Sequence, residues 1–209
     1  MTTRTIAGAG PAAARVALMA ALDAETIMLA TEDVLRRYGP AKATVVDVAR
    51  ALGVSHAAVY RHFSSKAALR EAVARRWLSR AVDGLHAVAA DASTPPPERL
   101  TAWLVALNRS KRRAVKDEPE LFATFGVLVR EDSRAASDHV AVLLGQLESI
   151  IAAGVASGDF AVTDPAGAAV AVFAATFAFH HPAHADSWER PGQDELLDEV
   201  CALVVRGLR

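Results

Sequence analysis

The 209-residue chain has a single cysteine, Cys201, and aromatic residues make up only 6% of it. One cysteine excludes a disulfide within the chain and is compatible with the reducing cytoplasm, where we expect the protein. The neighbouring Val200, Leu203 and Val204 indicate that Cys201 is a small buried apolar residue rather than a redox sensor.

Strand-forming and membrane-spanning patterns are also scarce. No strand-like alternation of apolar and polar residues is evident, which favours an all-α fold. No apolar run reaches membrane length, and the most apolar stretch, residues 166–179, is interpreted as a buried helix. The N-terminus lacks the solid apolar segment and clean cleavage site of a signal peptide. Residues 1–16 are expected to form a flexible arm, for which a tail without function is favoured over a segment that touches DNA.

Patterns typical of enzymes are absent as well. The sequence has no serine in a nucleophile elbow, no glycine-rich phosphate loop and no carboxylate pair spaced for catalysis. His180, His181 and His184 suggest a metal site, because imidazole is the commonest metal ligand. Pro182 disrupts the helical geometry that would align them, and no cysteine or glutamate with ligand spacing accompanies them. A helix-end or dimer-contact role is therefore favoured, and neither a metal nor another cofactor is expected.

Charge is distributed unevenly along the chain, although the net charge is only −1. Residues 1–86 contain 12 Lys and Arg against 7 Asp and Glu, a net charge of +5, whereas residues 87–209 contain 11 against 17, a net charge of −6. Between residues 50 and 80 the only acidic residue is Glu71. This asymmetry indicates that the first part approaches phosphates. A second basic cluster, over residues 111–116, is interpreted as a solvated face at a helix end.

Two short helices joined by a tight turn form the most informative pattern. Thr44 is a suitable helix N-cap, and Asp47 three residues later completes a pattern like a capping box. Gly53 supplies a permissive backbone at the turn, and Ser55 can cap a second helix from His56 to about His62. Helix, glycine-containing turn and helix is the arrangement that lays its second helix in the major groove of DNA. The pattern therefore predicts a transcriptional regulator.

The helix-turn-helix belongs to a longer run of informative residues. It comprises Asp47-Val48-Ala49, Leu52-Gly53-Val54-Ser55, Val59-Tyr60-Arg61-His62-Phe63, Ser65-Lys66 and Leu69. This run resembles the TetR family of transcriptional regulators almost position for position, over about residues 25–75. Two positions depart from the usual pattern: His56 stands where a lysine is often found, and Leu35 where a phenylalanine is common.

Helical spacing of apolar residues predicts the other elements. A helix capped by Ser64 or Ser65 keeps apolar residues at steps of three or four to about residue 90, and a run of three prolines then follows. Further helices are predicted over about residues 97–115, 119–130, 134–156, 165–179 and 194–208. With the resemblance, this implies about nine helices in an all-α fold. The expected organisation is a flexible arm (1–16), a helix-turn-helix DNA-binding domain (17–66), a connecting helix (67–90) and a regulatory and dimerisation domain (91–209).

The resemblance also implies which residues touch double-stranded DNA. Tyr60, Lys66 and Thr44 resemble phosphate contacts, whereas His56, Ala57 and Arg61 stand where base edges are commonly read. Small alanines let the helix backbone approach the groove. The alternative is an ordinary solvated helix, an interpretation that we accept for the core residues Val59 and Phe63. The full predicted set is Thr44, Ser55, His56, Ala57, Ala58, Tyr60, Arg61, His62 and Lys66.

The predicted function is that of a repressor released by a small-molecule effector, although activation remains open. A single short recognition helix reads few bases, so we expect a homodimer on a palindromic operator, paired through helices 165–179 and 194–208. The resemblance implies an effector pocket in the second part whose occupation displaces helix 65–90. Its walls suggest an apolar or aromatic effector, although each could be plain core. The candidate walls are Trp103, Leu107, Phe122, Phe125, Leu147 and Phe173.

A helical small-molecule binding or catalytic protein without DNA binding is the alternative function. It would use the first three helices only as scaffold. The basic stretch between residues 50 and 80 argues against it.

Overall fold

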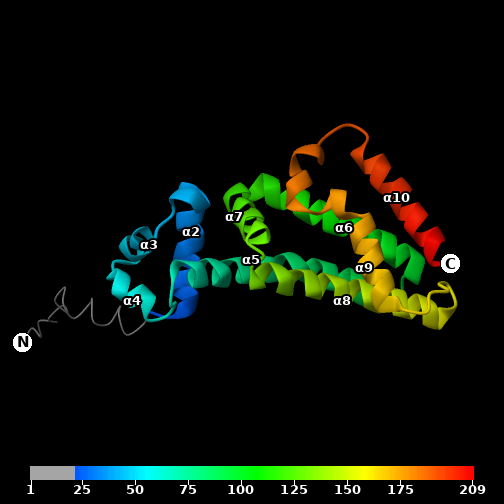
Figure 1. Cartoon of the computed structure of the whole chain (residues 1–209), viewed down its shortest axis with the longest axis horizontal. Coiled ribbons are helices and arrows are strands. Elements are labelled where there is room, and N and C mark those ends of the chain that lie inside the picture. Colours follow the sequence, from blue (N-terminus) through cyan, green and yellow to red (C-terminus); the bar gives the residue numbers. More distant parts are fainter. Residues whose placement is uncertain (1–21) are drawn as a thin grey trace, which may run out of the picture. The chain divides into compact units, whose positions relative to one another are not determined.

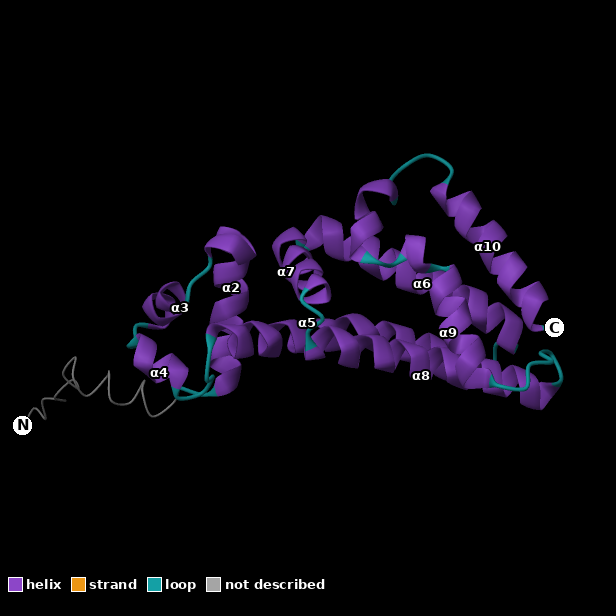
Figure 2. Ribbon diagram, in the orientation of Figure 1, coloured by secondary structure: helices purple, strands orange, loops and turns teal. Residues whose placement is uncertain are grey.

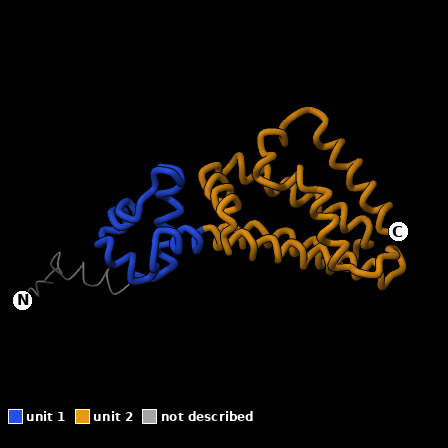
Figure 3. The backbone as a smooth tube through the Cα atoms, in the orientation of Figure 1, with its two compact units in different colours: residues 1–73 blue, residues 74–209 orange. Residues whose placement is uncertain are grey.

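The computed structural model describes residues 22–209, and every regular element within this range is a helix (Figure 2). The predicted arm over residues 1–16 and the predicted domain start at residue 17 lie outside the described residues. The nine α-helices of the described part, α2 to α10, confirm the all-α fold class. The chain divides into two compact units, residues 1–73 and residues 74–209, so the division falls inside a long helix (Figure 3).

Unit 1 contains α2 (Ala24–Lys42), α3 (Val45–Leu52), α4 (His56–Tyr60) and the start of α5 (Lys66–Ala90) (Figure 1). The regular part of α2 ends at Gly39, where φ is 72° and ψ is 166°, and Pro40 follows. This break agrees with the sequence, because a glycine followed by proline ends a helix readily. The core of the unit consists of buried apolar side chains of these helices: Ile27, Val34, Leu35, Val45, Val48, Ala49, Val59, Leu69 and Val73.

Unit 2 contains the rest of α5, followed by five α-helices and two short 3-10 segments. α8 packs against α6 and α9, and α10 packs against the same two helices. Their shared core includes Leu100, Trp103, Leu147 and Ile150. The indole Nε1 of Trp103 donates a hydrogen bond of 2.8 Å to Oε1 of Gln146, so these two buried polar groups satisfy each other. The elements are α6 (Pro96–Asp117), α7 (Pro119–Arg130), α8 (Arg134–Ser157), α9 (Pro165–Ala175), η1 (Phe177–Phe179), η2 (Pro182–Ser187) and α10 (Gln193–Leu208).

Most helix bounds lie within two residues of the predicted ones, but α9 ends earlier than expected. The sequence predicted a helix over residues 165–179, whereas α9 ends at Ala175 and a 3-10 turn follows. The hydroxyl of Thr176 donates to the carbonyl of Val172 at 2.9 Å, and the ring of His180 contacts the carbonyl of Phe173. Side chains thus bond the last carbonyls of α9, which allows the helix to end among apolar residues.

One described helix, α8, is long and apolar enough to cross a membrane, judged by length and composition alone. The sequence expectation concerned an uninterrupted apolar run, and Gln146 and Glu148 interrupt the apolar residues of α8. Core helices pass the same test. The inward face of α8 supplies Leu143, Leu147, Ile150 and Ile151 to the core of unit 2. Two large apolar side chains of α8, Val142 and Val155, are exposed on its other face.

Cys201 lies on the inward face of α10, as the sequence predicted. It is 1% exposed, and its burial raises the pKa of the thiol to about 11, with a smaller contribution from the nearby carboxylate of Asp198. A thiol that stays protonated and covered is a packing residue rather than a redox sensor.

Candidate functional site

The helix-turn-helix of unit 1 is held in shape by reciprocal caps. The Thr44 hydroxyl accepts a hydrogen bond of 3.2 Å from the N–H of Asp47, and the Asp47 carboxylate accepts one of 3.2 Å from the N–H of Thr44. The hydroxyl of Thr44 also donates to this carboxylate at 2.5 Å, which is the main reason that the pKa of Asp47 is lowered. Gly53 ends α3 with a φ of 66°, and Ser55 caps α4 through the N–H of Ala58 at 3.3 Å. The predicted capping box and turn are confirmed.

Eight of the nine predicted DNA-contact residues are exposed on unit 1. Ala58 is the exception: its side chain is 0% exposed, so the prediction that it touches DNA was wrong. Ala58 and Val59 are the two buried residues of α4, and this helix packs against α3. The rings of His56 and Tyr60 meet edge to face with centroids 6.4 Å apart, which orders two neighbouring side chains of the predicted surface. The exposed residues are Thr44, Ser55, His56, Ala57, Tyr60, Arg61, His62 and Lys66.

The start of α5 has the character of an anion site. Ser65 caps this helix by accepting a hydrogen bond of 3.0 Å from the N–H of Ala68. The first turn contains Lys66 and no acidic residue. The Lys66 cation lies at the positive end of the helix dipole, which is unfavourable for the isolated helix. The lysine charge and the helix N-terminus would both attract a phosphate.

Unit 2 contains a cavity of about 470 Å³, called here the Lys111 cavity. Of the six predicted pocket residues, Phe125 and Phe173 line this cavity. The other four, Trp103, Leu107, Phe122 and Leu147, are buried in the packing and line neither this cavity nor the second one described below. The lining comes from α6 (Lys111), α7 (Phe125 and Val129), the α7–α8 turn (Asp132), α8 (Ala136, Ser137, His139, Val140, Ala141, Leu143 and Leu144), α9 (Phe173) and the following turns (Phe177, His180, His181 and Pro182).

Lys111 corrects the expectation that residues 111–116 form a solvated face. It is 5% exposed, and its Nζ lies 2.9 Å from Nε2 of His139 and 4.7 Å from the ring centroid of Phe125. Burial lowers the pKa of Lys111 to about 8. Arg112 is half-buried and pairs with Glu189 and Asp194, whereas Arg113 and Lys116 are exposed as expected. Sequence analysis missed Lys111 because it treated the charge run as one solvated face, although helical spacing places Lys111 four residues after Leu107 on the inward stripe of α6.

The histidines near the end of α9 pack on aromatic rings. His180 stacks on Phe173 with centroids 4.2 Å apart, and His181 stacks on Phe177 at 4.0 Å. Burial lowers the pKa of His180 to about 4 and is the main cause of a lowered pKa at His181. Across residues 22–209, no group of three or more His, Cys, Asp and Glu side chains is arranged to hold a metal ion. His180 and His181 instead form part of the Lys111 cavity wall, whereas His184 contacts the ring of Phe177 and does not line the cavity.

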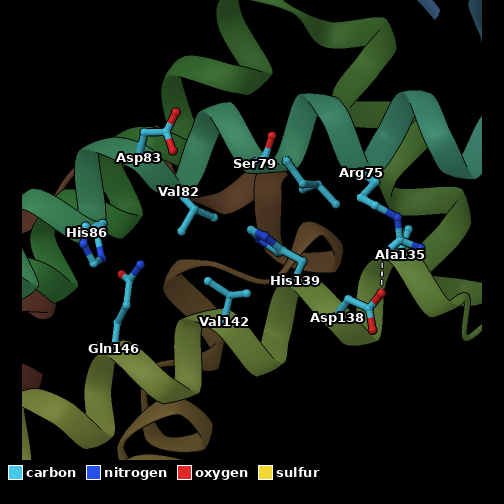
Figure 4. Close-up of a pocket in the computed structure, with 11 residues that line it drawn as sticks. Arg75, Ser79, Val82, Asp83, His86, Ala135, Asp138, His139, Val142 and Gln146 are labelled. Carbon is cyan, nitrogen blue, oxygen red and sulfur yellow. Dashed lines mark hydrogen bonds and ion pairs between the residues drawn. The ribbon is translucent and has the colours of Figure 1, made fainter. Parts of the chain in front are cut away.

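A second cavity of about 400 Å³ lies between α5 and α8 (Figure 4). Arg75 of α5 forms an ion pair with Asp138 of α8 at one end of it. His139, the residue after Asp138, lines this cavity and also the Lys111 cavity. Burial lowers the pKa of His139 to about 2, and the positive charge of Lys111 acts in the same direction. His139 is thus the residue that the walls of the two cavities share.

α9 and α10 present large apolar side chains to the outside of unit 2. Val170 on α9 is 55% exposed, and Leu203 on α10 is 59% exposed, with Leu196 two turns before it also exposed. The surrounding exposed residues of α9 are mostly small, namely Ala166, Gly167, Ala171, Ala174 and Ala175. Small residues let a second helix approach closely, so this surface is suited to helix packing.

Comparisons with known proteins agree with this arrangement. A family model described as "Bacterial regulatory proteins, tetR family" matches residues 27–73, and one described as "Tetracyclin repressor-like, C-terminal domain" matches residues 96–201. An uncharacterized HTH-type transcriptional regulator of Mycobacterium tuberculosis is 36% identical over 104 residues. The aligned part is 50% of this chain and 49% of that protein, so the chain spans about half the length of the curated relatives it matches.

Solved structures share the fold of the chain. A TetR/AcrR-family regulator from Thermobifida fusca is 23% identical with a TM-score of 0.61, over 89% of this chain and 98% of that one. FadR from Bacillus subtilis, solved with stearoyl-CoA, is 15% identical with a TM-score of 0.66, over 90% and 100%. SmeT, the repressor of a multidrug efflux pump of Stenotrophomonas maltophilia, is 20% identical with a TM-score of 0.65, over 88% and 91%. At these identities the likeness concerns the fold alone.

Proposed function

Because the chain belongs to the tetR family of bacterial regulatory proteins, we propose that it is a repressor which binds a palindromic operator as a homodimer and releases it when a small molecule occupies the Lys111 cavity. The family consists of transcriptional regulators, in agreement with the expectation that the chain is not an enzyme. The proposal places the chain with the DNA, in the cytoplasm.

The exposed surface of α4 and the start of α5 supports DNA binding, and it is the observation that carries the proposal. Tyr60 and Lys66 contact phosphates, with Thr44 doing the same from the start of α3. His56, Ala57 and Arg61 meet base edges in the major groove. Each good base contact is expected to contribute about 1–3 kcal/mol of discrimination against a wrong base. Ser55 and His62 lie at the two ends of α4 and complete the surface.

The apolar surface of α9 and α10 supports the homodimer. Val170 and Leu203 are too exposed to be core residues of one chain, and a second copy would cover them. A two-fold dimer presents two copies of α4, with half-sites about 34–36 Å apart or a multiple of that distance. This is why the operator is expected to be a palindrome.

The shared position of His139 supports regulation through α8. A ligand in the Lys111 cavity contacts the α8 turn that carries both Asp138 and His139. Asp138 is paired with Arg75 of α5, and α5 also carries Lys66 at its start. Displacement of α8 would therefore act on the helix that leads to the DNA-contacting residues. A typical coupling of about 1–3 kcal/mol requires the ligand to bind the DNA-incompetent state better by that amount.

Selection of binding sites from random duplex DNA tests the proposal. We expect the full chain to enrich a short palindrome whose affinity falls steeply with salt concentration. Recovery of sequences without a consensus would exclude a sequence-specific operator. A chain that bound small molecules tightly but retarded no DNA would instead support the alternative function, a helical binding or catalytic protein whose first helices are scaffold.

A further inference from the structure

The Lys111 cavity contains a buried ammonium group with no counter-charge among the described residues. Its contacts are the ring nitrogen of His139 and the face of Phe125, and no carboxylate lies within ion-pair distance of its Nζ. An ammonium has three donors, and His139 can accept from one of them. His139 is the only described residue within hydrogen-bond distance of Lys111 Nζ, and Lys111 lines the cavity.

The groups around Lys111 do not supply the negative charge that its buried ammonium group lacks. His139 and His180 are both buried in the same cavity wall, and both are held neutral by burial and by the charge of Lys111. His181 accepts the N–H of Ala183 at Nδ1, so its other ring nitrogen is the one that carries a proton. The only acidic residue of the lining, Asp132, is exposed, where water screens its charge. The interior of the cavity is therefore rich in donors and poor in negative charge.

The rest of the lining is apolar. Phe125 comes from α7, Leu143 and Leu144 come from α8, and Phe173 comes from α9. A volume of about 470 Å³ lies within the ordinary range of about 300–1,000 Å³ for small-molecule sites. Pockets of this kind bind the apolar body of a ligand and orient it through a few polar groups.

We propose that the Lys111 cavity is a site for an apolar monocarboxylic acid, with the carboxylate at Lys111 Nζ and the hydrocarbon or aromatic body against Phe125, Leu144 and Phe173. The carboxylate supplies the charge that Lys111 lacks and accepts its unused donors. Charge-assisted hydrogen bonds of this kind are about twice as strong as neutral ones. This inference rests on the proposed function, since it names the chemical class of the effector.

Two acids and two matched amphiphiles test the site on the full chain. Decanoate and 4-phenylbutyrate carry the carboxylate, whereas decan-1-ol and decylamine keep the decanoate chain but replace its head group. We expect calorimetry to give a decanoate affinity at least about tenfold higher than that of either decyl analogue at pH 7. Binding should weaken above pH about 8, where Lys111 loses its proton. Failure of both acids to bind, or equal affinity for decanoate and decan-1-ol, would overturn the proposal.

The variant Lys111→Met keeps an unbranched side chain, one atom shorter, and removes its charge. It should lower the decanoate affinity by about tenfold or more while leaving decan-1-ol binding unchanged or stronger. Arg113→Met, two residues later on α6 and exposed, is the matched control and should bind decanoate as the parent chain does. Undiminished decanoate affinity in Lys111→Met would contradict the assignment. Retention of decan-1-ol binding shows that the variant is folded.

The same titrations separate this inference from the proposed function. Acid binding that left the selected DNA bound at saturation would overturn the effector role, whereas the carboxylate site would stand. Absence of a selected operator would overturn the proposed function, with the calorimetry of the cavity unaffected. Release of the operator by decanoate from the parent chain but not from Lys111→Met would support both.

Discussion

The ring of Phe160 lies directly over the backbone of Gly154. A Cβ atom added to Gly154 would stand 2.1 Å from Cδ2 of Phe160, well inside the distance that real Cβ atoms keep. The N–H of Phe160 donates to the carbonyl of Gly154 at 3.0 Å, and the ring is buried in the core of unit 2. This contact closes the end of α8, just before Gly158 takes a φ of 83°.

We predict that Gly154→Ala lowers the free energy of unfolding by about 1–3 kcal/mol, because the new methyl group must displace a buried ring. Gly145→Ala on the same helix is the control. Its Cβ would meet nothing within 4 Å, so the variant should gain up to about 1 kcal/mol from helix propensity. Urea titrations of both variants measure the difference. If Gly154→Ala and Gly145→Ala unfold at the same urea concentration, the Phe160 ring moves aside without an energetic cost, and the prediction is wrong.

DNA binding should depend on the exposed residues of unit 1. The double variant Tyr60→Ala with Lys66→Ala is expected to bind the selected operator more weakly and with a smaller salt dependence, since it neutralises fewer phosphates. Removal of the Lys66 charge should reduce the slope of log affinity against log salt by about one. Lys116→Ala, an exposed basic residue of unit 2, is the control. An unchanged affinity and slope in the double variant would show that DNA binds to other residues.

Acid should destabilise the chain through His180. Its pKa is about 4 in the folded chain, below the ordinary 6.5, so between these values the unfolded chain binds a proton that the folded chain does not. The contribution of His180 to the free energy of unfolding is therefore fully present above pH 6.5. It is lost as pH falls towards 4, by on the order of 3 kcal/mol. His180→Gln should reduce the loss in this range, and the remaining loss comes from His139, whose pKa is lowered to about 2. Thermal unfolding from pH 7 to pH 4 measures the effect, and identical profiles would contradict it.

The homodimer should depend on the outer surface of α9 and α10. Leu203→Glu places a charge in the centre of the proposed interface, so sedimentation at micromolar concentration should return a species of 22.1 kDa. Leu29→Glu on α2, also an exposed apolar position, should leave the dimer intact. A parent chain that sediments as a 22.1 kDa species throughout would exclude the dimer itself.

Local chemistry explains why the helix-turn-helix could be predicted in detail. The Thr44 and Asp47 caps, the left-handed Gly53 and the Ser55 cap each depend on residues within a few positions of one another. Short-range hydrogen bonds of this kind depend little on the rest of the fold.

Burial explains why other predictions failed. Lys111 continues the inward stripe of Leu104 and Leu107, whereas Arg113 lies on the outer side of α6. The sequence interpretation missed this because it assigned the whole charge run to solvent on the basis of charge alone. Ala58 is buried because α4 packs against α3, a contact between two helices that the sequence of α4 alone does not show. The predicted pocket walls Trp103 and Leu147 proved to be core because large apolar residues carry the same pattern in a wall and in a core. Cavities depend on distant elements, so sequence spacing alone could not locate them.

The covered thiol of Cys201 makes the chain well suited to site-directed labelling. At neutral pH a buried thiol with a pKa of about 11 reacts very slowly with maleimides, and the sequence contains no second cysteine. A cysteine introduced at the exposed Ala67 would therefore carry a spin label alone, on an otherwise unchanged chain. In a homodimer the two labels define a single distance between the first turns of the two α5 helices. A change in this distance on adding operator or carboxylic acid would show whether DNA and ligand favour different spacings of the two α5 helices.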